Sequence, residues 1–324
     1  MTNVNRIDVP AMLSGDMKKV YEYQLAHPAE DLGPDYPSLR RAYVNERRFW
    51  NEGGPMMKET LDLEVPTPYG SVSARLHKPG GIRPGVLVYI HGGGYLLGGL
   101  DTHDRIMRML AELSGLAVLG VEYTLSPEAK FPQAIEECAG ACAWLHEHQD
   151  EFGLDMSKVA FAGDSAGAHI AMATALWIRD KGVRCGTVAG LLLYYGLYGL
   201  SDSPSRRLFG GPWDGLAPED LALYEDLYLP EGAAREEAAG SPYYCIFNGD
   251  LTHDVPPLFI VSAQYDPLRD DSAALHEVVS AHGGESVYEC VPGVMHAFLH
   301  HSRMLPETVD VMRKGAAFLK EHMD

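Results

Sequence analysis

Gly163-Asp164-Ser165-Ala166-Gly167 is the most informative segment of this 324-residue chain. It follows a short apolar run, residues 158–162, and precedes a run of small residues with helical character. Gly-x-Ser-x-Gly between a strand and a helix is typical of a sharp turn that projects the serine hydroxyl above a sheet, and the glycines are needed because the turn leaves no room for bulk. The sequence therefore predicts a strand, a tight turn and a helix, with Ser165 as a candidate nucleophile.

Short apolar runs and helical stretches alternate on both sides of this turn. Runs rich in branched residues and bounded by glycine or polar turns predict buried strands. The first two runs flank a Pro68-Tyr69-Gly70 turn and predict an antiparallel hairpin. The whole pattern indicates an α/β fold with a mainly parallel central sheet flanked by helices. The expected strands are 61–66, 72–78, 86–90, 117–121, 158–162, 191–194, 258–261 and 287–291, and the expected helices are 104–113, 134–148, 166–180, 272–282 and 307–322.

Two regions depart from this alternation. The connection between Tyr194 and Pro257 is about 60 residues long, far longer than an ordinary crossover, and it contains an expected helix at 217–229. Before the sheet, residues 16–26 and 38–51 have helical character, with Ser38 placed as the N-cap of the second helix. We therefore expect a helical cap over the carboxyl edge of the sheet. It would consist of an N-terminal segment, 1–55, and a segment inserted at about 198–250 into the main α/β domain, 56–324.

Two residues downstream could activate Ser165. A serine hydroxyl is a weak nucleophile near neutral pH, so it needs an imidazole to take its proton and a carboxylate to orient that imidazole. Asp266 follows the expected strand 258–261, and His296 follows the expected strand 287–291. Both lie beyond the carboxyl ends of strands, where α/β sheets place their sites. We expect Ser165, Asp266 and His296 to form a catalytic triad; the alternatives are an Asp-Pro turn and an ordinary loop histidine.

A run of three glycines predicts a site for a developing negative charge. His91-Gly92-Gly93-Gly94 follows the expected strand 86–90, and only glycines let consecutive backbone N–H groups converge without obstruction. The N–H of Ala166, at the start of a helix, offers another donor. We expect an oxyanion hole for acyl transfer at Gly92, Gly93, Gly94 and Ala166. The same glycines fit neither a dinucleotide fingerprint nor a phosphate-binding loop.

Taken together, these motifs resemble the hormone-sensitive-lipase-like branch of the α/β-hydrolases. The likeness covers essentially the whole chain and is greatest to the members from enteric bacteria that cleave acetyl esters. It rests on His91–Gly94, Gly163–Gly167, Asp266–Leu268 and His296–Phe298, and it includes Tyr123–Glu128, Leu100–Arg105 and Ser241–Cys245.

The resemblance implies an α/β-hydrolase fold and a cytoplasmic carboxylesterase for short acyl chains. In that reading Ser165 is the nucleophile, His296 the acid and base, Asp266 its orienting group, and Gly93, Gly94 and Ala166 the oxyanion donors. It implies no cofactor and no metal. It also suggests a homodimer and two protein partners, a maltose-gene transcription activator and an α-galactosidase. Two other functions stay open: a binding or regulatory module on a hydrolase fold, and an amidase that uses the same triad.

Composition excludes several other classes of function. With 26 basic and 45 acidic side chains the chain carries a formal charge of −19, which disfavours nucleic-acid and anionic-membrane binding. The longest nearly apolar stretch, 188–200, is shorter than the roughly 20 residues of a membrane-spanning helix. The first residues show no secretory signal, and five scattered cysteines favour a reducing cytoplasm. We expect Cys138 and Cys142 to be packing residues.

Several further residues have two readings each. His300 and His301 could join His296 in a metal site, but we expect them on a solvated face. An arginine cluster at 40, 41, 47 and 48 is expected to be solvated and paired with acids such as Glu46. Asp164 could tune its neighbours or make structural hydrogen bonds. Aromatic and apolar residues that could line a pocket or simply pack in the core or cap are Tyr95, Leu96, Tyr195, Tyr198 and Trp213.

Overall fold

An eight-stranded sheet runs through the computed structural model, which describes residues 7–324. Its strand order is β1-β2-β4-β3-β5-β6-β7-β8. The pairs β1–β2 and β2–β4 are antiparallel, and every other neighbouring pair is parallel. The predicted mainly parallel sheet is thus confirmed. The strands are β1 (Glu59–Thr67), β2 (Gly70–Lys78), β3 (Val86–Ile90), β4 (Ala117–Glu122), β5 (Lys158–Asp164), β6 (Thr187–Tyr194), β7 (Leu258–Tyr265) and β8 (Ser286–Met295).

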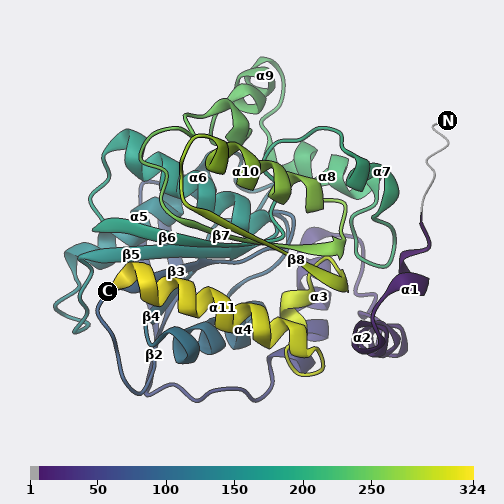
Figure 1. The fold of residues 1–324 in the computed structure, drawn as a ribbon, viewed down its shortest axis with the longest axis horizontal. Coiled ribbons are helices and arrows are strands. Elements are labelled where there is room, and N and C mark those ends of the chain that lie inside the picture. Colours follow the sequence, from purple (N-terminus) through teal and green to yellow (C-terminus); the bar gives the residue numbers. More distant parts are fainter. Residues whose placement is uncertain (1–6) are drawn as a thin grey trace.

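Helices cover both faces of this sheet, as expected. Figure 1 shows α5, α6 and α10 on one face and α4 and α11 on the other. These five helices are α4 (Leu100–Ser114), α5 (Gln133–Glu147), α6 (Ala166–Lys181), α10 (Arg269–Ala281) and α11 (Pro306–Met323). α4, α5, α10 and α11 pack their apolar sides on the strands, whereas α6 is buried along most of its length.

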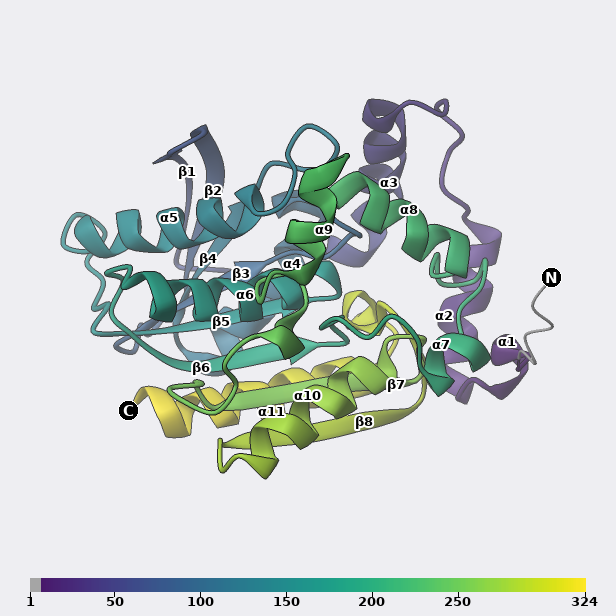
Figure 2. The ribbon, with the colours of Figure 1, turned by 90° about the horizontal axis from the view of Figure 1, so that it is seen from above.

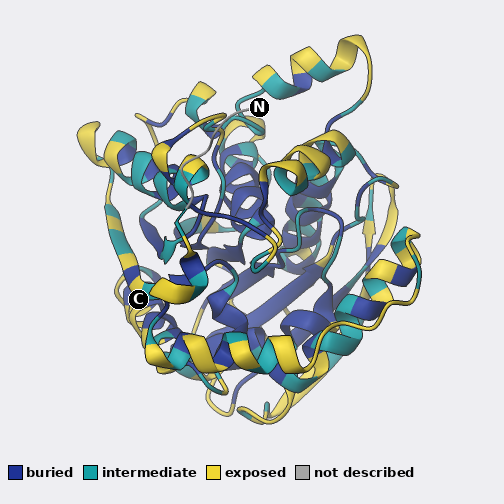
Figure 3. Ribbon diagram, turned by 90° about the vertical axis from the view of Figure 1, so that its right-hand side faces the viewer, coloured by how far each residue is buried: buried dark blue, intermediate teal, exposed yellow. Residues whose placement is uncertain are grey.

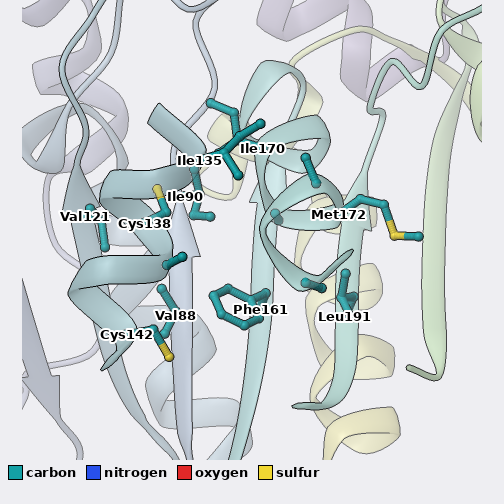
Figure 4. Close-up of a cluster of buried hydrophobic side chains, with 14 of the residues drawn as sticks. Val88, Ile90, Val121, Ile135, Cys138, Cys142, Phe161, Ile170, Met172 and Leu191 are labelled. Carbon is teal, nitrogen blue, oxygen red and sulfur yellow. The ribbon is translucent and has the colours of Figure 1, made fainter. Parts of the chain in front are cut away.

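Two hydrophobic clusters, one on each face, hold these layers together. On the face covered by α5 and α6, Val88 and Phe161 from the sheet pack with Ile135 and Ile170 from the helices (Figure 4). Cys138 and Cys142 are fully buried in the same cluster, so the prediction that they are packing residues is confirmed. Figure 3 shows buried strands enclosed by helices whose outer faces are exposed.

The remaining helices gather at one end of the sheet. Figure 2 shows α1, α2, α3, α7 and α8 there. The two segments that supply them touch each other, since the Ile7 N–H donates to the Leu208 carbonyl at 3.2 Å. These helices, with α9 and two short 3-10 helices, are α1 (Val9–Met12), α2 (Gly15–Ala26), α3 (Tyr36–Asn51), α7 (Pro204–Leu208), α8 (Pro218–Tyr228), α9 (Ala233–Gly240), η1 (Ile246–Asn248) and η2 (Phe298–His301). Residues 1–6 of the expected N-terminal segment lie outside the described residues.

One predicted helix cap was wrong. α3 begins at Tyr36, two residues earlier than expected, and Asp35 is its N-cap. The Asp35 carboxylate accepts hydrogen bonds from the Ser38 N–H at 3.0 Å and from the Ser38 hydroxyl at 2.7 Å. Aspartate is a good N-cap and proline is well tolerated in the first turn, so the Asp35-Tyr36-Pro37 sequence favours the earlier start.

None of the helices formed by residues 7–324 combines the length and apolarity needed to span a lipid bilayer.

Candidate active site

The turn between β5 and α6 holds Ser165 in a strained conformation. Its backbone angles are φ 54° and ψ −124°, which a residue with a side chain rarely adopts. The flanking glycines allow this turn. A Cβ on Gly163 would lie 2.3 Å from the Gly167 carbonyl oxygen, and a Cβ on Gly167 would lie 2.1 Å from the Ile90 carbonyl oxygen. The predicted strand, tight turn and helix are therefore all present, and strain of this kind is common at functional sites.

The structure brings the three predicted triad residues together. His296 Nε2 lies 2.8 Å from Ser165 Oγ, and His296 Nδ1 lies 2.7 Å from Asp266 Oδ2. A carboxylate can only accept, so Nδ1 carries the proton that is donated to Asp266, and Nε2 is free to accept the Ser165 hydroxyl proton. Asp266 is completely buried, and its other oxygen accepts from the Leu268 N–H at 2.7 Å. Asp266 is thus fixed from two sides.

Electrostatics favours a basic His296. Burial of the ring lowers its pKa, but the charge and hydrogen bond of Asp266, together with the charges of Asp214 and Asp164, outweigh burial and leave the pKa above the ordinary 6.5. The opposite charge stabilises an imidazolium, which is the form that a general base reaches during catalysis.

The glycine loop after β3 places two of its three N–H groups at the site. The N–H groups of Gly93, Gly94 and Ala166 have no hydrogen-bond partner within residues 7–324, and all three residues line the same cavity as Ser165. Gly93 has φ +122°, and a Cβ there would lie 2.2 Å from the Leu97 carbonyl oxygen, so the loop requires glycine. The Gly92 N–H, by contrast, donates to Asp164 Oδ1 at 3.0 Å. The expectation that Gly92 serves as an oxyanion donor is corrected, because its N–H is already used.

Asp164, beside the nucleophile, is a buried hydrogen-bond centre. Besides the Gly92 N–H, it accepts from the Tyr89 hydroxyl at 2.7 Å, and His103 Nε2 lies 3.3 Å away. Burial raises the pKa of Asp164, but His103 and these hydrogen bonds together lower it to about 2. An ionised Asp164 therefore ties the turn after β5 to the glycine loop after β3. The structure thus shows the structural hydrogen bonds of the two alternatives considered for this residue.

A cavity of about 1520 Å³ opens above Ser165. Besides Ser165 and His296, its lining includes Tyr43 and Arg47 from α3, and Tyr224 from α8. Of the five side chains proposed as pocket or packing residues, Tyr95 lines the cavity; Leu96, Tyr195, Tyr198 and Trp213 are not part of that lining.

Comparison with known protein families agrees with this geometry. A family model described as "alpha/beta hydrolase fold" matches residues 87–300. The chain belongs to the α/β hydrolases. The predicted resemblance is therefore confirmed. This hydrolase is 51% identical over 320 residues to proteins named acetyl esterase from Salmonella paratyphi A and Salmonella dublin, with 98% of each chain covered.

Solved structures of esterases share the fold of this α/β hydrolase. An esterase from Pyrobaculum calidifontis has 32% identity and a TM-score of 0.85, covering 95% of this chain and 98% of its own. The thermophilic carboxylesterase EstE1, cloned from a metagenomic library, has 30% identity and a TM-score of 0.82, covering 90% and 98%.

Two predictions about histidines in this hydrolase were wrong. His300 and His301, expected on a solvated face, are 4% and 1% exposed. They belong to η2, which contacts both α3 and α4, so the His300 ring packs on His103 at 4.5 Å and the His301 ring packs on Trp50 at 4.5 Å. Burial lowers the pKa of both histidines well below 6.5.

One group of buried side chains has the spacing of a possible metal site. Ligand atoms of His103, Asp164 and His300 lie within 4.8 Å of one another, a spacing that could hold an ion. His103 and Asp164 already contact each other there, and Asp164 also serves Tyr89 and Gly92.

The arginine cluster divides into different environments. Arg40 pairs with Glu128 at 2.7 Å, across to the segment after β4. Arg48 is exposed, as expected. Arg47, however, is buried and lines the cavity, which contradicts the expectation that it is solvated. The periodicity of the sequence predicted that Arg47 lies on a helix. It did not show which side of that helix faces the cavity.

Proposed function

We propose that this α/β hydrolase is a serine carboxylesterase of the acetyl esterase type, which cleaves esters of short acyl chains. The observation that carries the proposal is the contact of Ser165 Oγ with His296 Nε2 at 2.8 Å, with Nδ1 of the same ring 2.7 Å from Asp266. The names of the 51% identical relatives support the acetyl preference.

In the first half of the reaction, Ser165 attacks the ester carbonyl carbon while His296 takes the hydroxyl proton. Asp266 stabilises the imidazolium that forms. The carbonyl oxygen becomes an oxyanion, and the N–H groups of Gly93, Gly94 and Ala166 stabilise it by hydrogen bonds that need no rearrangement. The intermediate then collapses, the bond to the alcohol oxygen breaks, and His296 gives its proton to the leaving alcohol. An acyl-Ser165 ester remains.

In the second half, water replaces the alcohol. His296 takes a proton from the water as it attacks the acyl carbon, the same donors hold the second oxyanion, and His296 returns the proton to Ser165 Oγ. The products are the carboxylic acid and the alcohol. All the catalytic groups in these steps belong to the chain, so the proposal requires no cofactor.

The N-terminal segment 1–55 and the inserted segment at about 198–250 form the cap in this proposal. Support comes from the cavity, whose lining includes Tyr43 from the first segment and Leu216, Leu221 and Tyr224 from the second. Side chains of such a cap would restrict the size of the bound ester.

We also propose a cytoplasmic location, which five free cysteines support. A homodimer and contacts with a maltose-gene transcription activator and an α-galactosidase remain predictions that rest on the family resemblance alone. Light scattering of the purified protein and co-purification with each candidate partner test them.

An activity profile across acyl lengths tests the proposed function. Acetyl, butyryl and octanoyl esters of p-nitrophenol are compared with p-nitroacetanilide, the amide that corresponds to the acetate. We expect kcat/KM to be highest for the short esters and at least about 100-fold lower for the amide, because the amine is a poorer leaving group than the phenolate. We also expect Ser165→Ala to lose several orders of magnitude in kcat. Ester cleavage retained in a folded Ser165→Ala variant would reject the proposal, and preferential cleavage of the amide would support an amidase.

A further inference from the structure

Arg47 is a buried cation in the cavity with unused hydrogen-bond donors. Its side chain comes from α3, and the residue is 8% exposed. Neither Nε nor Nη1 has a hydrogen-bond partner within residues 7–324. Of the other two arginines in the cavity lining, Arg207 is paired with Asp202, and Arg206 donates to Asp271 at 3.0 Å and leaves only Nε without a partner.

The neighbours of Arg47 keep it charged without satisfying it. Glu46 Oε2 lies 3.3 Å from Nε, outside hydrogen-bond geometry, and Glu46 Oε1 accepts from Trp50 Nε1 at 3.1 Å. The guanidinium carbon lies 4.8 Å from the centre of the Tyr43 ring. Burial works against the charge, but Tyr43 and Glu46 outweigh it and raise the pKa of Arg47. A buried polar group without a partner is costly, so this arrangement favours a ligand that supplies acceptors.

Arg47 lies on the His296 side of the cavity. The Tyr195 ring packs on His296 with centroids 4.8 Å apart. η2 begins two residues after His296 and contacts α3, the helix that carries Arg47, which places Arg47 on the same side as His296. His296 is the group that hands its proton to the leaving alcohol. The alcohol half of a bound ester must therefore lie on this side.

Most acidic side chains that line the same cavity are already hydrogen-bonded or ion-paired with other groups. Asp164 accepts from Tyr89 and Gly92, Asp202 is paired with Arg207, and Glu225 is paired with Arg235. Asp214 belongs to the inserted segment, where its Oδ1 accepts from two backbone N–H groups. Arg47 itself is ion-paired with Glu46 at 3.3 Å, so what it offers a ligand is its two unpartnered donors, Nε and Nη1.

We propose that Arg47 binds a carboxylate on the alcohol half of the ester substrate. The proposal rests on the proposed esterase function and specifies its substrate class: acyl esters of hydroxy acids, rather than of simple alkyl alcohols. A guanidinium suits this role because its planar fork can donate two parallel hydrogen bonds to one carboxylate.

A pair of aryl acetates isolates this contact. In 4-acetoxybenzoate the alcohol half carries a carboxylate, and in 4-acetoxybenzamide a neutral group of the same shape replaces it. The quantity to compare is the ratio of kcat/KM for the benzoate to kcat/KM for the benzamide, because intrinsic reactivity cancels when this ratio is compared between proteins. We expect Arg47→Met to lower the ratio about 10- to 100-fold, the usual size of a hydrogen bond to a charged group.

Arg48→Met is the matched control. It removes the same charge from the next residue of α3, where the side chain is exposed, so it tests whether net charge alone matters. We expect it to leave the ratio unchanged, and we expect Arg47→Lys, which keeps the charge but loses the fork, to fall between wild type and Arg47→Met. A circular dichroism spectrum and a thermal unfolding midpoint close to those of the wild type show that Arg47→Met is folded.

The outcomes separate the two proposals. An unchanged ratio in an Arg47→Met variant that still cleaves the esters would overturn the role of Arg47 in binding a carboxylate. A wild-type protein that cleaves neither ester would overturn the esterase function itself. If Arg47→Met is inactive on both esters, inhibition of the wild type decides: 4-hydroxybenzoate should inhibit more strongly than 4-hydroxybenzamide, and equal inhibition would contradict the proposal.

Discussion

Asp266 acts on the reaction only through His296. Its Oδ2 lies 2.7 Å from Nδ1 and fixes the ring with Nε2 toward Ser165. In Asp266→Asn the amide can donate to Nδ1, which would move the proton to Nε2 and leave no acceptor for the serine hydroxyl. We expect kcat to fall about 10⁴-fold with the fold intact. Pre-steady-state and steady-state kinetics on p-nitrophenyl acetate measure this, and a loss below about tenfold would remove Asp266 from the triad.

The raised pKa of His296 sets the acid limb of the pH profile. Burial lowers this pKa, but the charge and hydrogen bond of Asp266 and the charges of Asp214 and Asp164 together raise it above 6.5. His296 must be neutral to accept the serine proton, so activity is present above its pKa and is lost as the pH falls through it. We expect kcat/KM for a neutral ester to fall on acidification with an apparent pKa above 6.5. A midpoint well below 6.5 would show that Asp266 does not stabilise the imidazolium as described.

The residues found from sequence are those whose chemistry is carried by a local motif. Ser165, Asp266 and His296 follow strands in a chain order that predicts their meeting. Gly92 was assigned wrongly because a glycine run does not show which N–H groups are free, and the acceptor, Asp164, lies on another strand. Arg47 and His300 were missed because the packing of η2 with α3 and α4 helps to bury them, and no pattern in these segments encodes those contacts.

The loop between β3 and α4 requires glycine at position 93. Gly93 has φ +122° and no space for a Cβ next to the Leu97 carbonyl oxygen. Gly93→Ala should displace the loop and lower kcat about 100-fold or more, the cost of losing an oxyanion donor. Gly182→Ala is a matched control, since Gly182 also has positive φ (+63°) but nothing lies within 4 Å of a Cβ there. We expect Gly182→Ala to lose about 1 kcal/mol of stability and no activity. Equal activity of the two variants would reject the role of this loop in stabilising the oxyanion.

The regular elements were predicted better than the inserted segment. β3 is a short run of branched and apolar residues, and α6 is a long run of small and apolar residues, so their composition and length identify them. In the inserted segment, α8 was predicted at 217–229 and begins at Pro218. The five residues of α7 and the eight of α9 were not predicted, because such short helices are stabilised by tertiary contacts rather than by their own sequence.

For the whole molecule, four buried histidines predict a strong loss of stability in mild acid. Burial lowers the pKa of His91 to about 3 and of His169 to about 4, and it lowers the pKa values of His300 and His301 well below 6.5. These groups are neutral when folded and become protonated on unfolding below pH 6.5. The stability that they contribute is therefore complete above 6.5 and is lost as the pH falls toward their folded pKa values.

The expected loss of stability from these four histidines is large. Each histidine contributes about 1.4 kcal/mol per pH unit below 6.5, so the four together lower the free energy of unfolding by roughly 5 kcal/mol between pH 7.0 and pH 5.5. His296 and the carboxyl groups of Asp214, Glu122 and Asp271, whose pKa values are raised, have the opposite effect and offset part of this loss. Urea denaturation at the two pH values measures the difference. Equal free energies of unfolding would mean that these histidines are not held neutral in the folded protein.

The central claim is that Ser165 is the nucleophile of an esterase, and covalent labelling tests it most directly. Diethyl p-nitrophenyl phosphate transfers its diethylphosphoryl group to an activated serine and releases p-nitrophenolate. We predict one such group per chain by intact mass, located at Ser165 by peptide mapping, with activity lost in proportion and no labelling of Ser165→Ala. An active protein that stays unlabelled, or a label on another residue that accounts for the lost activity, would contradict the account.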